Sequence, residues 1–362
     1  MIRLSTARTD LFRRRLAGQY LTTPGPKTAA DVVRALGAVQ AQDYGGAKWA
    51  VAQRTSGATD ADVERELTAG SILRTHVLRP TWHFVSAEDI RWMLALTGPR
   101  VIAAMAYHDR VNGLTPAAFR RSNAALTKAL AGGKHLTRLE LAKVLNRARL
   151  GTTSGQLVGL MMRAELDAVV CSGPRRGKQF TYALFDERVP PSAALDRDAA
   201  LLELTRRYFG TRGPATTRDF AWWSGLTLAD SRRAIEIAAT ELEHLTIGEE
   251  RFHFIDRDLP KVKPSAHLLP NYDEYFIGYK DRAALAHRLG HSKPVTGGSW
   301  LNSHVVFVDG QLVGEWRRSV EKSRLVVELD LAAPITQTEK GRIAAAAKRL
   351  GVFQGLPVTV TG

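Results

Sequence analysis

Cysteine is almost absent from this 362-residue chain, because Cys171 is its single example. One thiol excludes a disulfide framework and a thiolate metal cluster. The ten histidines are scattered without a zinc-binding spacing, and the motifs HExxH, CxxC and the Asp-rich calcium loop do not occur. We therefore expect neither a metal nor another cofactor.

Long hydrophobic runs are missing as well. No apolar run reaches the roughly 18 residues that a membrane-spanning helix needs. The first residues, "MIRLSTARTDLFRRRLAG", are basic but lack the apolar core of a secretory signal. The sequence predicts a soluble, cytoplasmic protein without a membrane partner.

Two familiar enzyme motifs are absent or incomplete. GxSxG, the nucleophile turn of many hydrolases, does not occur. The stretch "GPRRGKQ" resembles a phosphate-binding loop, but its spacing is short and Gln179 stands where a Mg²⁺-binding Ser or Thr is required. A basic hairpin tip is the better interpretation of this stretch.

Acidic residues are in the minority, since 51 Lys and Arg face 36 Asp and Glu, for a formal charge of +15. This balance favours a polyanionic partner, with nucleic acid preferred over an anionic membrane. The alternative is that the positive charge serves only to keep the protein soluble. Because arginines recur along the whole chain, nucleic acid is preferred. A hydrophobic content of 44% is ample for burying cores, and the length favours two to four domains.

A weak internal repeat organises the first two thirds of the chain. Three segments each begin with a threonine, an acid three residues later and then an apolar run, which is the pattern of a capped helix start. The pairs are Thr28 with Asp31, Thr137 with Glu140, and Thr216 with Asp219. A second helix and two strand-like runs follow each start. Helix, helix and hairpin in this order predict three tandem winged-helix units, with an unrelated α+β chain as the alternative.

The repeat also places most of the basic side chains that we expect to contact DNA. We predict an amphipathic helix over residues 31–39, second helices over 154–166 and 227–239, and hairpins over 72–85, 168–184 and 244–255. The tip of the second hairpin carries Arg175, Arg176 and Lys178, and the second helix of the third unit carries Arg232 and Arg233.

The last hundred residues differ in pattern and predict a small C-terminal β-rich domain with one helix. Asp309-Gly310 between alternating runs indicates a type I′ hairpin, "SRLVVELDL" adds a strand, and "EKGRIAAAAKRLG" predicts a helix ending at Gly351. The boundary falls in "DLPKVKPS", where prolines and lysines interrupt both periodicities. The predicted domains are residues 1–115, 116–195, 196–258 and 259–362.

The stretch "VQAQDYGG" is the main candidate for chemistry. Gln40 and Gln42 face one side if the backbone is extended, and amides can hold a water although they are poor bases near pH 7. The alternative is that both satisfy backbone groups at a helix end. Asp43 is either a base or electrostatic stabiliser, or the start of an Asx turn before two glycines.

Other polar clusters carry open alternatives. "LRTHVLRPTWHFV" holds Arg79, Thr81, Trp82 and His83, with Arg79-Pro80 at the expected tip; His83 is either a DNA reader or a buried core residue. "LLPNYDEYFIGYKDR" reads as a buried polar network rather than a catalytic acid site. "AWWSG", with Trp222 and Trp223, is expected in the core.

Taken together, "LGAVQAQ", "RPTWHFVSAEDIRWML", "LLPNYDEYFIGYKDR" and "VDGQLVGEWRR" resemble the AlkZ-like DNA glycosylase family over about residues 28–320. The resemblance implies three winged-helix units in a C-shaped clamp with a C-terminal β domain. It also implies hydrolysis of the N-glycosidic bond of alkylated bases, including bulky N7-alkylguanine adducts and interstrand crosslinks. Gln40-Ala41-Gln42 matches the Gln-Φ-Gln hallmark, where Φ is apolar, and Thr81 and His83 match a Thr-x-His strand. Pro80 departs from the Gly that the family often has there.

The implied chemistry agrees with the residues. N7 alkylation gives the base a positive charge, so it leaves as a neutral molecule without an acid, and an oriented water suffices. No lysine is needed, so we predict a monofunctional glycosylase that leaves an abasic site. We also expect a monomer whose partner is double-stranded DNA with alkylated bases. The alternative is a non-enzymatic winged-helix transcriptional regulator; a nuclease would need clustered metal-binding carboxylates, which the sequence lacks.

Overall fold

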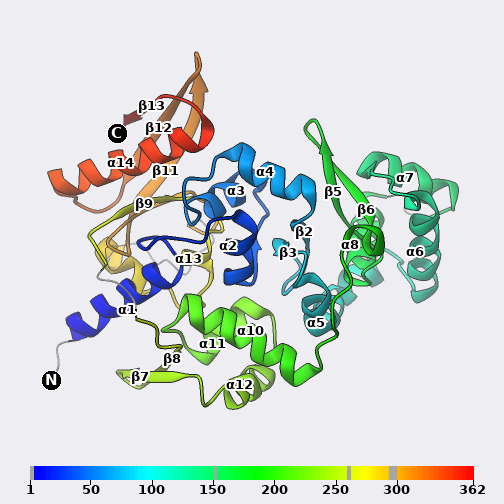
Figure 1. Cartoon of the computed structure of the whole chain (residues 1–362), viewed down its shortest axis with the longest axis horizontal. Coiled ribbons are helices and arrows are strands. Elements are labelled where there is room, and N and C mark those ends of the chain that lie inside the picture. The colour runs from blue at the N-terminus through cyan, green and yellow to red at the C-terminus, as the bar shows by residue number, and fades with distance from the viewer. Residues whose placement is uncertain (1–3, 151–152, 259–261, 293–299) are drawn as a thin grey trace. The chain divides into compact units, whose positions relative to one another are not determined.

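The structure is a computed structural model that describes residues 4–150, 153–258, 262–292 and 300–362. It is a mixed α+β fold of helices and small sheets, as predicted, and divides into two compact units (Figure 1). Unit 1 comprises residues 1–63, 202–223 and 227–362, and unit 2 comprises residues 64–201 and 224–226. Unit 1 thus combines residues from three of the four predicted segments. The four-domain division itself stays a prediction.

The N-terminal part of unit 1 carries the glutamines. Its elements are α1 (Leu4–Gly18), α2 (Ala29–Leu36), β1 (Val39–Gln40) and α3 (Tyr44–Ala52). The helix predicted over residues 31–39 is displaced along the chain, because α2 begins at Ala29, Gly37 (φ 78°) caps its end and Val39 lies in a strand. Helix α3 was not predicted, since two glycines at its start argue against a helix; Asp43 caps it.

The middle part of unit 1 contains the third repeat. Its elements are α10 (Arg197–Arg212, which begins in unit 2), α11 (Thr217–Ser224), α12 (Leu228–Ile237), β7 (Glu243–Ile247) and β8 (Glu250–Phe254). Aromatic side chains of α10 and α11 form its core, with Tyr208 in ring contact with Phe209, Phe220 and Trp223. The core prediction for the tryptophan pair is half right: Trp223 is fully buried, but Trp222 is 42% exposed.

The C-terminal part of unit 1 is built on a five-stranded sheet of order β13-β12-β11-β10-β9. Its elements are β9 (Ala266–Leu269), α13 (Glu274–Ile277), η1 (Ala284–Ser292), β10 (Val305–Val308), β11 (Gln311–Glu321), β12 (Arg324–Leu331), α14 (Gln337–Gln354) and β13 (Val358–Thr361). Both residues of the predicted turn, Asp309 and Gly310, have positive φ, which confirms the type I′ hairpin. The last helix runs past Gly351 to Gln354.

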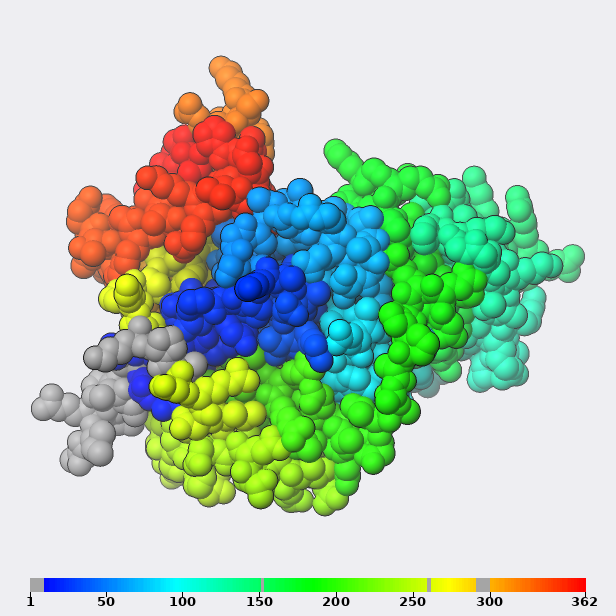
Figure 2. Space-filling view, viewed as in Figure 1, coloured from blue at the N-terminus to red at the C-terminus, as the bar shows by residue number. Residues whose placement is uncertain are grey.

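The predicted boundary over residues 258–265 lies partly outside the described residues, which omit 259–261. In the C-terminal part of the chain, β11 and β12 form a hairpin, and its turn projects from the rest of unit 1 (Figure 2).

Unit 2 contains the first hairpin and the second repeat. Its elements are α4 (Asp60–Ala69, which begins in unit 1), β2 (Ile72–His76), β3 (Trp82–Ser86), α5 (Ile90–Val111), α6 (Pro116–Leu130), β4 (Leu136–Thr137), α7 (Arg138–Arg147), α8 (Ser154–Leu166), β5 (Val170–Arg176), β6 (Gln179–Leu184) and α9 (Phe185–Arg188). Helices α6, α7 and α8 pack around buried Leu126, Leu141 and Leu160, beside a sheet of order β4-β6-β5.

The three repeated helix starts are capped as predicted. The backbone N–H groups of Asp31, Glu140 and Asp219 donate to the threonine Oγ1 three residues earlier, over 3.1, 3.3 and 3.1 Å. The starts at Thr137 and Thr216 are each followed by a second helix and a hairpin, as predicted, whereas β1 and the additional helix α3 separate the start at Thr28 from α4 and its hairpin. The assignment of the three segments as winged-helix units stays a prediction.

Candidate active site

The glutamine motif, Gln40-Ala41-Gln42, lies in unit 1 between α2 and α3. The backbone is extended at β1, and side chains alternate as expected of such a segment. Ala41 is fully buried, Gln40 is partly buried and Gln42 is exposed. The buried alanine holds the segment to the core while the two amides lie on its accessible side.

A buried carboxylate fixes the backbone of the motif. The N–H of Gln40 donates to Oε1 of Glu274 over 2.9 Å. The other oxygen of Glu274 accepts from Arg212 Nη2 at 2.6 Å and from Trp223 Nε1 at 2.8 Å. Arg212 also donates to the carbonyls of Leu36 and Ala38, just before the motif. The segment from Leu36 to Gln40 is therefore held by an ion pair with no solvent exposure.

A second buried pair extends this network. Arg54 donates both Nη atoms to the carboxylate of Asp273, at 2.7 and 2.9 Å, and both side chains are fully buried. Gln19 links the pair to Tyr279, whose hydroxyl donates to the Arg212 carbonyl over 3.0 Å. Burial raises the pKa of Tyr279 to about 12. The cluster in "LLPNYDEYFIGYKDR" is thus a buried polar network, and Tyr279 is not poised to transfer a proton near pH 7.

Asp43 has the structural role that was one of its two interpretations. Its Oδ1 accepts the N–H of Gly46 over 3.1 Å, which caps α3. A Cβ on Gly46 would lie 2.8 Å from Asp43 Oδ2 and 3.0 Å from Pro270 Cβ, so a glycine is required there. The cap does not test the electrostatic role of Asp43.

Two side chains of the C-terminal sheet lie beside Asp43. Arg318 Nη2 is 3.3 Å, and Asp43 Oδ1 is 3.8 Å, from the position of a Cβ on Gly45. His304 stacks on Trp316 with ring centroids 4.7 Å apart, and its Nδ1 accepts the N–H of Asn271. Burial lowers the pKa of His304, while the nearby Asp43 charge raises it. Because Nδ1 accepts a hydrogen bond, the neutral form of His304 carries its proton on Nε2.

The predicted residues of the first hairpin lie in unit 2. His83 is fully buried, with Nδ1 2.9 Å from the Thr81 carbonyl oxygen, which agrees with the core interpretation. Trp82 is partly buried between Arg74 at 4.1 Å and the ring of His76 at 4.0 Å. Arg79 lies in the predicted tip, which residues 77–81 form. The hairpin presents Arg79 and Trp82 rather than His83.

The basic tip of the second hairpin is partly neutralised within unit 2. Arg176 pairs with Glu140 at 2.9 Å, and Arg175 lies 3.5 Å from Glu64. The N–H of Thr137 and the Arg176 guanidinium hold the pKa of Glu140 at about 2. Lys178 is exposed at the turn, and Arg232 and Arg233 are exposed on α12 of unit 1.

Local sequence reasoning did not identify Arg212, Trp223 or Arg54, which support the motif from distant positions. The hydrophobic character of "AWWSG" predicted only a packing role for Trp223, whereas its indole N–H donates to Glu274. Within the described ranges, no three His, Cys, Asp or Glu side chains are grouped to hold a metal ion, and no helix is long and apolar enough to span a membrane.

Comparison with known proteins identifies relatives over nearly the whole chain. The sequence profile of the family described as DNA glycosylase AlkZ-like matches residues 33–353. An interstrand DNA cross-link repair glycosylase of Streptomyces sahachiroi is 29% identical over 366 residues, covering 94% of this chain and 93% of that protein. The solved structure of the Streptomyces sahachiroi DNA glycosylase AlkZ matches with a TM-score of 0.78 at 24% identity, covering 98% of this chain and 99% of the other. This likeness agrees with the mixed α+β fold described above.

Proposed function

Because this chain belongs to the AlkZ-like DNA glycosylase family, we propose that it hydrolyses the N-glycosidic bond of N7-alkylated purines in double-stranded DNA. The substrate class extends to bulky adducts and to interstrand crosslinks, which the name of the Streptomyces relative mentions. The product is an abasic site, and the enzyme is monofunctional.

The geometry of the glutamine motif carries this proposal. Gln40 ends β1, where Glu274 accepts its N–H, and Gln42 follows the buried Ala41 in the bend after the strand. Two amides on the accessible side of a short segment can orient a water molecule, since each amide both donates and accepts hydrogen bonds. Orientation of this kind lowers the barrier without proton transfer from the protein.

The proposed reaction needs little more than this water. Its oxygen forms a bond to C1′ of the sugar as the bond from C1′ to N9 of the base breaks. The electron pair of the broken bond passes to the base and neutralises the charge that alkylation placed on its imidazole ring. The water then releases a proton to solvent. Asp43, held next to the motif, supplies negative charge that favours the oxocarbenium-like transition state.

The three capped helix-and-hairpin segments supply the DNA-binding frame of the proposal. We assign them as winged-helix units that form a clamp, which accommodates bulky adducts without a tight base-flipping pocket. The proposed contacts to DNA are the exposed Arg176, Lys178, Arg232 and Arg233 and the partly buried Arg79, Thr81, Trp82 and Arg175. His83, which the family pattern also suggested, is fully buried, so its proposed part is to support the hairpin from within.

A single-turnover assay tests the function. Duplex DNA with one N7-methylguanine is incubated with excess enzyme and then heated in alkali, which breaks the strand at abasic sites. We expect strand breaks with the native enzyme, and rates about 10²- to 10⁴-fold lower for Gln40→Ala and Gln42→Ala, the range typical of groups that assist the reacting atoms.

Gln337→Ala is the matched control, because Gln337 is an exposed glutamine at the start of α14 in the same unit. Its rate should equal that of the native enzyme. Native enzyme that leaves the lesion strand intact would overturn the proposed activity. Full activity of Gln42→Ala would overturn the catalytic assignment alone.

A further inference from the structure

The turn that leads from α2 to the glutamine motif is held by Arg207 of α10. The Nη1 of Arg207 donates to the carbonyl oxygen of Arg34, and the same oxygen accepts the N–H of Gly37, which caps α2, over 3.0 Å. The last carbonyls of a helix lack partners within the helix, and a carbonyl oxygen can accept two hydrogen bonds. Arg207 therefore binds the oxygen that closes the turn before Gln40.

The stem of Arg207 lies against the same turn. Gly37 has a φ of 78°, and a Cβ on this residue would lie 3.4 Å from Arg207 Cβ and 3.4 Å from Trp223 Cη2. A positive φ favours glycine, and the missing side chain lets the turn approach α10 and α11 closely. Both the stem and the guanidinium of Arg207 are thus at the turn, three residues before Gln40.

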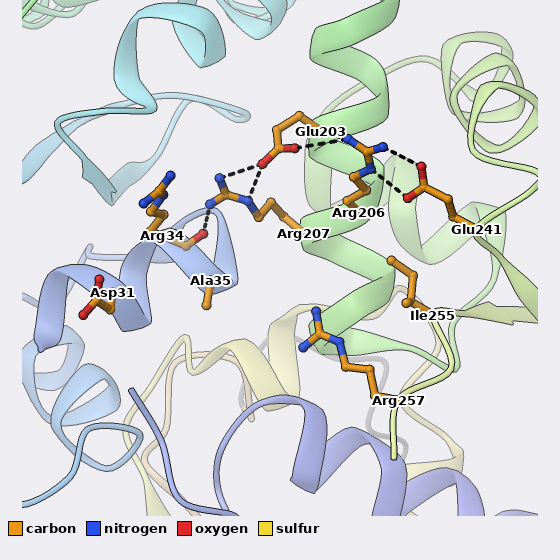
Figure 3. A pocket seen from close by; sticks show the side chains of 9 residues that line it. All are labelled: Asp31, Arg34, Ala35, Glu203, Arg206, Arg207, Glu241, Ile255 and Arg257. Carbon is orange, nitrogen blue, oxygen red and sulfur yellow. Dashed lines mark hydrogen bonds and ion pairs between the residues drawn. The ribbon is translucent and has the colours of Figure 1, made fainter. Parts of the chain in front are cut away.

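Glu203 orients the guanidinium of Arg207. One turn earlier on α10, its Oε1 accepts from Arg207 Nε at 2.7 Å and lies 2.6 Å from Nη2. The neighbouring Arg206 forms a bidentate pair with Glu241 at 2.5 and 2.7 Å. Figure 3 shows Arg207 reaching toward α2 and Arg206 turned to Glu241 instead. Two adjacent arginines of equal charge therefore have different tasks, and Arg207 is the one directed at the turn.

A cavity of about 400 Å³ lies beside the guanidinium of Arg207. It is bounded by Arg34 and Ala35 of α2, by Glu203 on α10 and by Ile255 in the segment that follows β8 (Figure 3). The contact between Arg207 and the end of α2 is therefore made at the wall of a cavity. A small planar cation can take the place of this guanidinium when the side chain is removed.

Arg207 supplements the buried support of the motif. Arg212, which has no solvent exposure, donates to the carbonyls of Leu36 and Ala38 over 2.8 and 3.2 Å. Arg207 holds the carbonyl of Arg34 in the same short segment. Two guanidinium groups of α10 thus bind three carbonyls between the last turn of α2 and β1, so the position of the motif depends on both.

We propose that Arg207 is a positioning residue for the glutamine motif, an inference that rests on the proposed orientation of water by Gln40 and Gln42. Arg207 does not touch the reacting atoms. It acts through the backbone, since the carbonyl that it holds closes the turn from which β1 starts. Displacing a reacting group by about 1 Å can cost on the order of 10²-fold in rate. The guanidinium keeps both amides within that tolerance.

A single-turnover assay on duplex with one N7-methylguanine, run at several enzyme concentrations, separates positioning from binding. For Arg207→Ala we expect a maximal rate about 10- to 100-fold below the native rate, because the turn loses a hydrogen bond that fixes it. Arg206→Ala is the matched control, since it removes the same charge one residue away, where the contacts are with Glu241 and, at 3.9 Å, with Glu203. It should keep the native maximal rate. Both variants should reach half of their maximal rate at the same enzyme concentration.

Chemical rescue distinguishes a lost hydrogen bond from damage to the fold. Methylguanidinium should raise the rate of Arg207→Ala severalfold and to a plateau, because its planar donors can occupy the vacated wall of the cavity. Methylammonium at the same ionic strength has the same charge without this fork of donors, and should leave the rate low. A native rate for Arg207→Ala, or a lowered rate that neither cation changes, would overturn the proposal.

Arg207→Lys replaces Arg207→Ala if urea denaturation shows that the alanine variant has lost its fold. The lysine keeps the charge and the stem beside Gly37, but an ammonium group lacks the fork that joins Glu203 to the carbonyl of Arg34. Its maximal rate should fall, by less than we expect for the alanine variant. If Arg207→Lys had the native rate, the guanidinium would not position the motif.

Hydrogen exchange measures the position of the segment without catalysis. The backbone amides of residues 37–42 should exchange faster in Arg207→Ala than in native protein, and Arg206→Ala should exchange as native protein does. Exchange in Arg207→Ala that equals native exchange would contradict the positioning role. Failure of the glycosylase proposal would show differently, as lesion DNA left intact by native protein, and the exchange comparison would then still decide whether Arg207 holds the segment.

Discussion

Two arginine–glutamate pairs, one in each unit, have similar geometry and different surroundings. Arg212 and Glu274 in unit 1 approach to 2.6 Å with no solvent exposure, while Arg176 and Glu140 in unit 2 approach to 2.9 Å with side chains 55% and 40% exposed. The buried pair also binds Trp223 and the motif backbone. The exposed pair closes a helix cap and a hairpin tip.

The difference is one of function as well as stability. A buried ion pair gains little net free energy, yet removal of one partner leaves an uncompensated charge, so the pair fixes its surroundings in one arrangement. An exposed pair is screened by water and can exchange its partner for another anion. We infer that unit 1 uses such a pair to hold the glutamine motif, while unit 2 keeps a wing cation that DNA phosphate can capture.

The largest expected effect comes from breaking the buried pair. Glu274→Ala leaves Arg212 charged and buried and removes the acceptor of Gln40 N–H. We expect the free energy of unfolding to fall by about 3–5 kcal/mol, measured by urea denaturation. The double variant Arg212→Met/Glu274→Leu should recover most of this loss, because no unpaired charge remains.

Arg176→Ala is the comparison variant, and its urea midpoint should match that of the native protein. If Arg176→Ala lowered the urea midpoint as much as Glu274→Ala does, solvent exposure would not explain a difference in stability between the two pairs. A Glu274→Ala protein as stable as native would show that the buried carboxylate does not hold the fold.

Local chemistry explains which parts of the fold could be predicted from the sequence. The capped starts at Thr28, Thr137 and Thr216 and the Asp309-Gly310 turn depend on residues within four positions, and all are present. Helix α3 was missed because its glycines have poor helix propensity, whereas its stability comes from a cap and from tertiary packing.

The same limit applies to the candidate site. Gln40 and Gln42 could be proposed from the sequence because their spacing and the family pattern that they match are local. Their support from Glu274 and Arg212 is far along the chain, and no periodicity encodes a contact at such separation. A strongly polar stretch such as "LLPNYDEYFIGYKDR" indicates a buried network, but it does not name the partners.

A smaller effect is expected from a buried histidine in the C-terminal sheet. Burial, with Arg349 and Arg54 nearby, lowers the pKa of His267 to about 3. Because the folded value lies below the unfolded value near 6.5, full stability is present above pH 6.5 and is lost as the pH falls toward 3. Between pH 6.5 and 5.0, at about 1.4 kcal/mol per pH unit, we expect this residue to contribute a loss of about 2 kcal/mol.

Urea midpoints measured from pH 7.5 to 5.0 for native protein and His267→Leu check this expectation. The variant should lose less stability on acidification than native protein. His287→Leu, a change at an exposed histidine, should behave as native. Parallel pH curves for native protein and His267→Leu would contradict the assignment.

The smallest effect is expected when the exposed pair of Arg176 and Glu140 is broken, so that Arg176 can bind a DNA phosphate instead. Glu140→Gln keeps the oxygen that accepts the Thr137 N–H but removes the charge that holds Arg176. The urea midpoint should not change. Duplex affinity at low salt should rise severalfold, and the salt slope should steepen by about 0.9 if the released Arg176 binds one phosphate.

The matched control for this change is Glu187→Gln in the same unit. Glu187 accepts the N–H groups of Gly132 and Gly133, and none of its contacts in the described structure is with an arginine, so its replacement removes the same charge without releasing a cation. If both variants raise affinity equally, the effect is one of net charge alone. A steeper salt slope for Glu140→Gln alone would show that Arg176, once released from Glu140, binds DNA phosphate. The buried Arg212–Glu274 pair has no such exchange, because neither of its side chains is exposed to solvent.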